Sequence, residues 1–510
     1  MNRKAVTLIL SVLFTAVSQA QLTPQEAAQG MQRGINIGNT MEPPTEGGWG
    51  IPPVQERCFD DYKNAGFTAI RIPITWDGHT STTPPYTIDS AWLSRVEQVV
   101  DWGLKRGLII IINAHHESWI KNSFTAANLA RFDSIWSQVS SRLQNKSDSL
   151  IFEIINEPYP MSEANVDSLN AATLKVIRRT NPTRIVSFSG YMWSNSDQLV
   201  IAKIPDPTDK YLLGYYHSYD PYPFGLIGTG SYGSASDINA TKARFDQVTT
   251  WSTQHKIPVM LGEFGYIDTA DYNSRMCAYA TVVDQSLVHG VPAFAWDDGG
   301  DFPVYNRQTG GFNEVKDILV HTYHQSPNGM KISQTGANVS QVRWHNRNTE
   351  QDSITVERKV GSGLFFPIAQ IGSSDSVFSD SSTFPGKSYY YRVSFLTKDS
   401  VLVQSYPVKI TPVVTIVQAV GSPLRYELFN NYPNPFNPTT TIQFTVPVRS
   451  TVSLRIFDPL GRAVAILEEG VLPAGVYTRT WNASGEASGV YFCRLQAGTF
   501  AQTKKLILLR

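Results

Sequence analysis

Two glutamates in this 510-residue chain each stand at the polar end of an apolar run. Glu157 follows LIFEIIN in residues 150–158, and Glu263 follows IPVMLG in residues 257–265. Each run is typical of a buried parallel strand, and each glutamate falls where the strand meets its following loop. Ligands of parallel α/β folds gather at this carboxyl end. Two carboxyl groups in one such mouth are the minimum equipment for splitting a glycosidic bond.

The elements that would position the glutamates repeat one rhythm from residue 30 to about 327: an apolar run, a polar loop, then apolar residues at helical spacing. The candidate strands are residues 34–38, 69–74, 108–113, 150–155, 184–188, 211–217, 257–263 and 291–296. Eight such units predict an α/β fold, a closed (β/α)8 barrel. A doubly wound open sheet is the alternative, but no glycine-rich phosphate loop follows any of these runs.

Composition and chain ends indicate where the protein works. Basic and acidic residues balance at 43 each, which gives no reason to expect nucleic acid or an anionic membrane as partner. Residues 1–20 have a basic start, an apolar stretch and a small residue at Ala20, which predicts a secretory signal peptide. The stretch is short for a membrane anchor, and no later segment predicts a membrane span. The three cysteines are far apart, so we expect buried free thiols.

The chain changes character after residue 327. Residues 328–413 alternate apolar with polar and predict a β-sandwich, followed by a linker over 414–430. Within the sandwich, SYYYRVSFL resembles a late strand of a fibronectin type III module. Residues 431–510 predict a second small immunoglobulin-like all-β domain, and PNPFNP, DPLGR and SGVYFCRL there resemble the C-terminal sorting domain of the type IX secretion system. An ordinary immunoglobulin-like stalk is the alternative.

Most predicted strands carry a polar or aromatic residue near the same end. The set comprises Arg71, His115, Asn156, Glu157, His217, Tyr219, Glu263 and Trp296. Any one of them could be a hydrogen-bonded core residue. Burying so many polar groups at one end of a barrel core would cost free energy, so together they predict a functional site.

The motifs RGINIGNT, GFTAIRIPITW, IIINAHHE, FEIINEP, YYHSYDP, MLGEFG and FAWDDG give a sharper resemblance. In this order they resemble glycoside hydrolase family 5, the family of cellulases, mannanases and related retaining β-glycanases. The resemblance covers almost all of residues 25–325. It implies that Glu157 is the general acid/base and Glu263 the nucleophile, with their carboxyl groups about 5–5.5 Å apart. One must hold a proton while the other stays charged.

The other predicted site residues support these two. Arg71 and the Tyr219 hydroxyl would keep Glu263 charged, and Asn156 would bind the sugar 2-hydroxyl. The resemblance further implies that His115 and His217 hold sugar hydroxyls and that Trp296 forms the floor on which the sugar stacks. Further aromatic residues could build flanking subsites or simply belong to the core: Trp49, Trp76, Trp119, Trp193 and Tyr222.

The triplet His115–His116–Glu117 raises the alternative of a metal site. Successive side chains on a strand point to opposite faces, so two adjacent histidines are poor ligands for one ion. We therefore expect no metal and no other cofactor.

These observations together predict a secreted or surface-attached, monomeric endo-β-1,4-glycanase, an endoglucanase acting on β-glucan and exported through its C-terminal domain. HSYDPYPF and WDDGGDF resemble endoglucanases and xyloglucanases more than mannanases. Xyloglucanase, mixed-linkage glucanase and β-mannanase remain alternatives. A non-catalytic glycan-binding protein would be expected to lack one of the glutamates, and both are present. A structural adhesin would need exposed aromatic clusters in the β-domains, and we identify none in the sequence.

Overall fold

The computed structural model describes residues 21–336, 338–347, 352–413 and 425–509. The predicted signal peptide lies outside these ranges. The chain divides into two compact units, one up to Val413 and one from Val414 onward. None of the helices in the described ranges is long and apolar enough to cross a membrane.

The first unit contains the predicted barrel, and the prediction of eight parallel strands is confirmed. The strands pair in sequence order and close the barrel through β1 and β8. They are β1 (Gly34–Asn36), β2 (Ala69–Ile72), β3 (Ile109–Asn113), β4 (Leu150–Glu153), β5 (Val186–Phe188), β6 (Leu212–Ser218), β7 (Val259–Phe264) and β8 (Ala293–Ala295). Nearly every strand residue is buried, as expected for strands covered on both faces.

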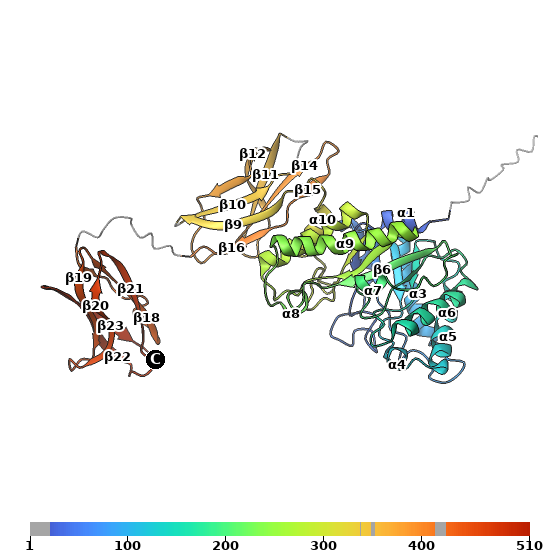
Figure 1. The fold of residues 1–510 in the computed structure, drawn as a ribbon, viewed down its shortest axis with the longest axis horizontal. Coiled ribbons are helices and arrows are strands. Elements are labelled where there is room, and N and C mark those ends of the chain that lie inside the picture. The colour runs from blue at the N-terminus through green and yellow to red at the C-terminus, as the bar shows by residue number, and fades with distance from the viewer. Residues whose placement is uncertain (1–20, 337, 348–351, 414–424, 510) are drawn as a thin grey trace, which may run out of the picture. The chain divides into compact units, whose positions relative to one another are not determined.

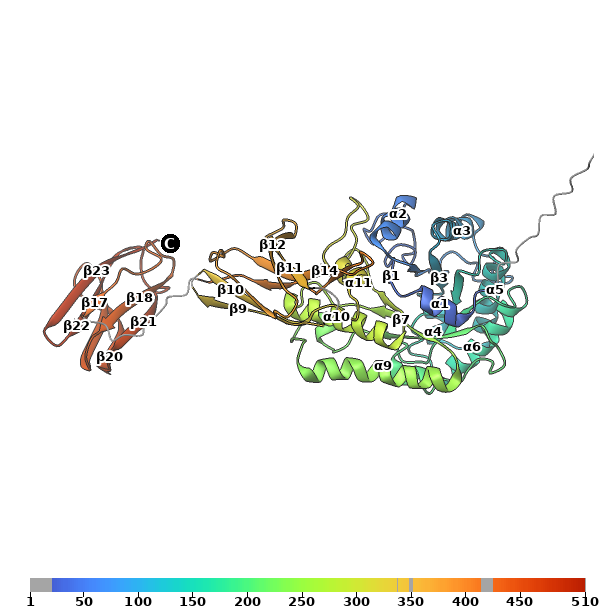
Figure 2. The same ribbon diagram turned by 90° about the horizontal axis from the view of Figure 1, so that it is seen from above.

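Helices surround the barrel (Figures 1 and 2). Their bounds are α1 (Pro24–Gly30), α2 (Glu56–Ala65), α3 (Ser90–Lys105), α4 (Ser118–Asn122), α5 (Ala126–Arg142), α6 (Glu163–Arg178), α7 (Ser196–Leu199), α8 (Phe224–Ile227), α9 (Ala235–His255), α10 (Tyr272–His289) and α11 (Val315–His321). Successive side chains of β3 point to opposite faces of the barrel wall. Ile109 and Ile111 therefore pack in the small inner cluster with Met31, whereas Ile110 and Ile112 join the larger cluster that includes the helices.

A β-sandwich follows the barrel within the first unit. Its strands are β9 (Asn328–Gly336), β10 (Val339–His345), β11 (Ser353–Val360), β12 (Phe366–Gly372), β13 (Val377–Asp380), β14 (Tyr389–Leu396), β15 (Leu402–Gln404) and β16 (Val408–Ile410). One sheet has the order β13-β10-β9, and the other has β12-β11-β14-β15 with β16 beside β14.

This sandwich packs on α10 and α11 of the barrel (Figure 2). Asn273 on α10 exchanges two hydrogen bonds with the backbone of Lys409, at 2.6 and 3.0 Å. Arg392 pairs with Asp317 on α11 at 2.6 Å. One continuous apolar cluster runs through both parts. The first sandwich therefore shares a core with the barrel.

The second unit is another small sandwich with its own core. Its strands are β17 (Glu427–Leu428), β18 (Thr439–Val446), β19 (Ser450–Phe457), β20 (Ala463–Leu472), β21 (Gly475–Asn482), β22 (Gly489–Ala497) and β23 (Phe500–Leu508). The sheets have the orders β17-β18-β21 and β20-β19-β22-β23. Strand β17 corrects the predicted linker over 414–430, because Leu428 is buried in this core and pairs with Phe444.

Candidate active site

A layer of polar side chains crosses the barrel near the carboxyl ends of its strands. The parallel register sets Asn36 beside Arg71 and Asn113 beside Glu153. A register shift after Tyr216 on β6 brings His217 beside Glu263 on β7. These groups are almost completely buried, so each needs a partner within the layer.

Arg71 is the centre of this layer. Its guanidinium donates two hydrogen bonds to Glu153, at 2.6 and 2.7 Å, in the bidentate geometry that carboxylates favour. It also donates to the side-chain oxygens of Asn36 at 2.9 Å and Asn156 at 2.8 Å. Its remaining contact is Nη1 to Oε1 of Glu263, at 2.6 Å. One buried cation thus holds several groups of the site in fixed positions.

Glu263 lies on β7 and is only 4% exposed. Arg71 donates to Oε1, and the Tyr219 hydroxyl donates to Oε2 at 2.8 Å. Both carboxylate oxygens therefore accept from donors on other elements. The predicted neighbours Arg71 and Tyr219 do lie against Glu263.

Glu157 has a different environment. It lies beyond the end of β4, its φ is 39°, and its side chain is 26% exposed. A left-handed backbone is costly for a non-glycine residue and is often found at functional sites. His217 Nδ1 lies 2.9 Å from Oε1 of Glu157 and 3.6 Å from Oε2 of Glu263. The two carboxylates each place an oxygen within 4.8 Å of the other.

The pKa of Glu157 is set by opposing effects. Burial raises this pKa. The hydrogen bond and charge of His217, with the charges of Lys121 and Arg71, lower it by more, so the pKa lies below its usual value. The arrangement therefore corresponds to the carboxylate form of Glu157, with the imidazole as donor.

His115 and Trp296 form another wall of the site. Their rings are stacked, with centroids 6.0 Å apart and planes at 12°. Asn113 donates to Nδ1 of His115 at 3.1 Å, which leaves Nε2 as the protonated nitrogen. Burial lowers the pKa of His115 well below its usual value, so the ring is neutral. Gly38 is needed beside it, because a Cβ there would lie 2.6 Å from the Trp296 indole.

The layer includes residues that the sequence reasoning missed. Glu153 and Asn113 were treated as ordinary strand positions, yet Asn113 donates to Glu153 at 2.8 Å. The available signal was a charged residue inside the apolar run LIFEII. Lys121 on α4 also lines the site, and its Nζ donates to the His115 carbonyl oxygen at 2.7 Å. Burial lowers the pKa of Lys121 to about 8.

These side chains open into a cleft of about 940 Å³ that contains both glutamates. Of the aromatic residues proposed for flanking subsites, Trp193 and Tyr222 line it. Trp193 stacks on Tyr159, with ring centroids 3.9 Å apart, and is carried by a left-handed backbone run from Met192 to Ser194. This exposed pair forms a flat apolar wall in the cleft.

The remaining three aromatic residues do not line this cleft. Trp76 is completely buried, and Trp119 is half-buried under Arg131. Trp49 is exposed and meets the edge of His116, with ring centroids 5.6 Å apart. Core packing therefore accounts for Trp76 and Trp119.

A metal ion would have to compete with existing contacts. Among the described residues, one group of three potential ligands lies close together: Glu157, His217 and Glu263. Both oxygens of Glu263 already accept from Arg71 and Tyr219, so a cation there would oppose the Arg71 charge. The prediction that His115 and His116 lie on a strand and point to opposite faces for that reason was wrong, because β3 ends at Asn113. Instead His115 is buried and His116 is exposed.

Fold and site together define a parallel (β/α)8 barrel with two glutamates in one cleft at the carboxyl ends of its strands. Comparison with known proteins identifies the family. Residues 28–300 match the family described as "Cellulase (glycosyl hydrolase family 5)", and the chain belongs to this family. Residues 430–509 match a secretion system C-terminal sorting domain. The two corresponding resemblances predicted from the sequence are confirmed.

Individual relatives agree with this family. Endoglucanase H of Acetivibrio thermocellus is 44% identical over 303 residues, which cover 58% of this chain and 33% of the relative. Cellulase/esterase CelE of the same organism is 30% identical and is covered to 37%. The chain thus spans about a third of the length of each of these two relatives. Endoglucanase B of Clostridium cellulovorans is 30% identical, with 56% of this chain and 72% of the relative covered.

Solved structures show the same barrel. Endoglucanase Cel5A from Thermotoga maritima is 30% identical with a TM-score of 0.56, and the match covers 59% of this chain and all of that one. A tri-modular endo-β-1,4-glucanase from Bacillus licheniformis covers 96% of this chain and 100% of its own, with a TM-score of 0.63. At 22% identity, this second match bears on the fold alone.

Proposed function

We propose that this protein is an exported retaining endo-β-1,4-glycanase that hydrolyses β-1,4-glucan with Glu263 as nucleophile and Glu157 as general acid/base. The observation that carries the proposal is the spacing of the two carboxylates, which place oxygens within 4.8 Å of each other. Retaining enzymes hold their carboxyl groups about 5–5.5 Å apart, whereas inverting enzymes need about 6.5–9.5 Å to admit a water.

In the first step Glu263 attacks the anomeric carbon while Glu157 protonates the departing oxygen. His217 Nδ1, 2.9 Å from Oε1 of Glu157, holds this carboxyl group in position. The protonated carboxyl group of Glu157 gives its own proton to the departing oxygen and becomes a carboxylate. The bond from carbon to the leaving oxygen breaks as the bond to Glu263 forms, which gives a glycosyl-enzyme ester.

In the second step Glu157, now a carboxylate, removes a proton from water. The resulting hydroxide attacks the anomeric carbon and releases Glu263, so the original configuration is retained. Asn156 Oδ1 accepts from Arg71, which directs the amide Nδ2 to the sugar 2-hydroxyl. His115, with Nε2 protonated, donates to another hydroxyl, and Trp296 stacks under the ring.

β-1,4-Glucan is the proposed substrate because the relatives reported above include endoglucanases. A second candidate has one specific observation in its favour: Thermotoga maritima Cel5A was solved in complex with cellobiose and with mannotriose. β-Mannan is therefore tested beside glucans. The wall of Trp193 and Tyr159 would stack on sugars beyond the scission point.

The test is reducing-sugar release by the full mature chain from carboxymethylcellulose, xyloglucan, mixed-linkage glucan, mannan and xylan. We expect release from a β-glucan with a fast fall in viscosity, which distinguishes internal cleavage from removal of end units. The folded Glu263→Ala variant is the control. No release from any of the five polymers would contradict the proposed activity and favour a glycan-binding protein.

The C-terminal sorting domain supports export. We propose that residues 430–509 address the protein to a secretion machinery, which delivers it across the outer membrane to the cell surface or the medium. Deleting these residues should leave the protein inside the cell envelope with its activity intact. Normal export of the deleted chain would contradict this role.

A further inference from the structure

A very close backbone contact lies beside Tyr219, the residue whose hydroxyl donates to Glu263. Tyr219 is the first residue after β6, and Gly225 follows it in the short helix α8. A Cβ on Gly225 would lie 1.8 Å from the Tyr219 carbonyl oxygen. Gly225 is helical, a conformation that alanine accepts readily. The close approach to Tyr219, and not the backbone conformation, therefore requires glycine at this position.

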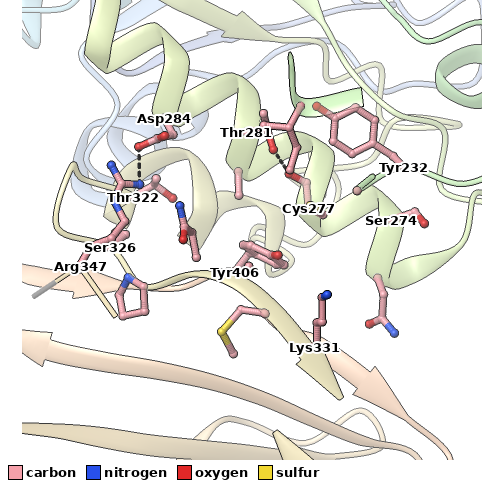
Figure 3. A pocket seen from close by; sticks show the side chains of 18 of the residues that line it. Tyr232, Ser274, Cys277, Thr281, Asp284, Thr322, Ser326, Lys331, Arg347 and Tyr406 are labelled. Atoms are coloured by element: carbon pink, nitrogen blue, oxygen red, sulfur yellow. Dashed lines mark hydrogen bonds and ion pairs between the residues drawn. The ribbon is translucent and has the colours of Figure 1, made fainter. Parts of the chain in front are cut away.

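Hydrogen bonds fix α8 to the next loop of the barrel. The carbonyl oxygen of Gly225 accepts from the Ile267 N–H at 2.9 Å, in the loop that follows β7. This loop leads into α10, which is paired with the first sandwich through Asp284 and Arg347 at 2.9 Å (Figure 3). Because α8 is held in this way, a side chain added at Gly225 is expected to displace the backbone of Tyr219.

The ring of Tyr219 is held from the loop that follows β8. Phe302 in this loop meets the ring edge to face, with centroids 5.7 Å apart and planes at 69°. Phe302 is itself fixed, because its N–H donates to Oδ1 of Asp298 at 3.0 Å. The same loop is joined to the loop after β7, where the Asp268 N–H donates to the Asp301 carbonyl oxygen at 2.9 Å. Connected loops thus hold Tyr219 both at its backbone and at its ring.

We propose that Gly225 and Phe302 are positioning residues that fix the Tyr219 hydroxyl on Oε2 of Glu263, at 2.8 Å. This role rests on the function proposed above for Glu263. Even C–H···O contacts keep carbon and oxygen about 3.3 Å apart, so the Cβ in Gly225→Ala would push the Tyr219 backbone by on the order of 1 Å. A shift of this size at the hydroxyl takes a 2.8 Å contact out of the normal range of hydrogen bonds.

The test is a double-mutant cycle on the full mature chain, with kcat and KM measured on a β-glucan that the wild-type protein cleaves. Gly225→Ala and Phe302→Leu are each combined with Tyr219→Phe. Alone, each should lower kcat/KM about tenfold or more, mainly through kcat, because the lost hydrogen bond lies at the reacting carboxylate. In the Tyr219→Phe background the hydroxyl is already absent, so each should cost less than about threefold.

Gly300→Ala is the matched control in the same wall of the cleft. The nearest atom to a Cβ there is Oδ1 of Asp298, at 3.6 Å, which is an ordinary contact, so kcat/KM should not change. Residues needed only for folding would lower the melting temperature and cost the same in both backgrounds. Equal losses with and without the Tyr219 hydroxyl would therefore overturn the proposal, and so would normal kcat/KM in both folded single variants.

Crystal structures of Gly225→Ala and Phe302→Leu test the geometry independently of the activity. We expect the Tyr219 hydroxyl to lie beyond hydrogen-bonding distance from Glu263 in these variants. An unchanged contact in both would overturn the positioning role even if the wild-type protein is an active hydrolase. An inactive wild-type protein with a displaced hydroxyl in the variants would instead contradict the function proposed for the cleft and support the positioning of Tyr219.

Discussion

The two glutamates proposed to be catalytic occupy contrasting regions of the same cleft. Glu263 lies on a regular strand, is nearly buried, and accepts hydrogen bonds from Arg71 and Tyr219, which come from different elements. Glu157 lies beyond its strand in a left-handed backbone conformation and is partly exposed. Its hydrogen-bond partner is His217 on β6, at 2.9 Å.

The difference matches what the two steps require. A nucleophile that forms and releases one covalent bond needs a constant charge and position, which donors fixed on the barrel provide. An acid that becomes a base must reach both the departing oxygen and the incoming water, and the partial exposure of Glu157 in the cleft allows this. The charge of Lys121 acts on Glu157 from its side of the cleft. On the other side, the buried Arg71 is bonded directly to Glu263.

The largest effect is expected from removing the carboxylate of Glu263, which Arg71 and Tyr219 hold in place. Glu263→Ala should lower kcat by on the order of 10⁶-fold, the scale on which loss of a nucleophile acts in covalent hydrolases. The fold should remain, because Arg71 keeps its bidentate partner Glu153. Steady-state rates and the melting temperature check both statements. A folded variant with ordinary activity would refute the nucleophile assignment.

Removing the carboxylate of Glu157, the proposed acid and base, should lower the rate by less and only for some substrates. Glu157→Ala should slow hydrolysis of the polymer about 10²- to 10⁴-fold, because the departing sugar oxygen then leaves without a proton. Aryl glycosides with acidic leaving groups should form the intermediate at a nearly normal rate, seen as a burst of released phenol. Equal losses on both substrates would show that Glu157 is not the acid.

Tyr219→Phe sharpens the Glu263 side of the comparison. It removes one hydrogen bond to a charged carboxylate, an interaction worth about 1.5–3 kcal/mol, so kcat/KM should fall about 10- to 100-fold. The matched change Tyr222→Phe alters an exposed tyrosine of the same cleft and should have little effect. Identical losses in the two variants would contradict a specific role for the Tyr219 hydroxyl.

Lys121→Met sharpens the Glu157 side, through pH dependence. The charge of Lys121 helps to lower the pKa of Glu157, and the alkaline limb of kcat/KM falls as Glu157 loses its proton. Without the cation the pKa of Glu157 rises, so the alkaline limb should move to higher pH. Lys121→Arg, which keeps the charge, should restore the original profile. An unchanged limb in Lys121→Met would show that the charge does not act on Glu157.

The sequence predicted the parts of this structure that depend on local pattern. All eight barrel strands were found, because apolar runs such as IIIIN are bounded by polar loops and recur at βα spacing. The two glutamates were found because both stand where such runs end. The polar layer was only half predicted. Glu153 was taken as part of the strand before Glu157, and its bidentate bond to Arg71 depends on the register of nonadjacent strands.

Other features depend on tertiary contacts that have no local signal. Lys121 looks like an ordinary solvated position on a short helix, and the path of the chain after β3 turns it into the cleft. The first sandwich looked like a separate domain, because the residues that fix it to the barrel, such as Arg392 and Lys409, are polar and alternate regularly with apolar ones.

The most direct test of the account is to trap the covalent intermediate. A 2-deoxy-2-fluoro cellobioside with an activated leaving group should inactivate the enzyme, and mass spectrometry of the digested protein should find the sugar on Glu263 in the peptide that contains residues 257–265. That label, with retained configuration in products from the natural substrate, is the predicted result. A label on Glu157, or products of inverted configuration, would contradict the assignment of Glu263 as nucleophile and Glu157 as general acid/base.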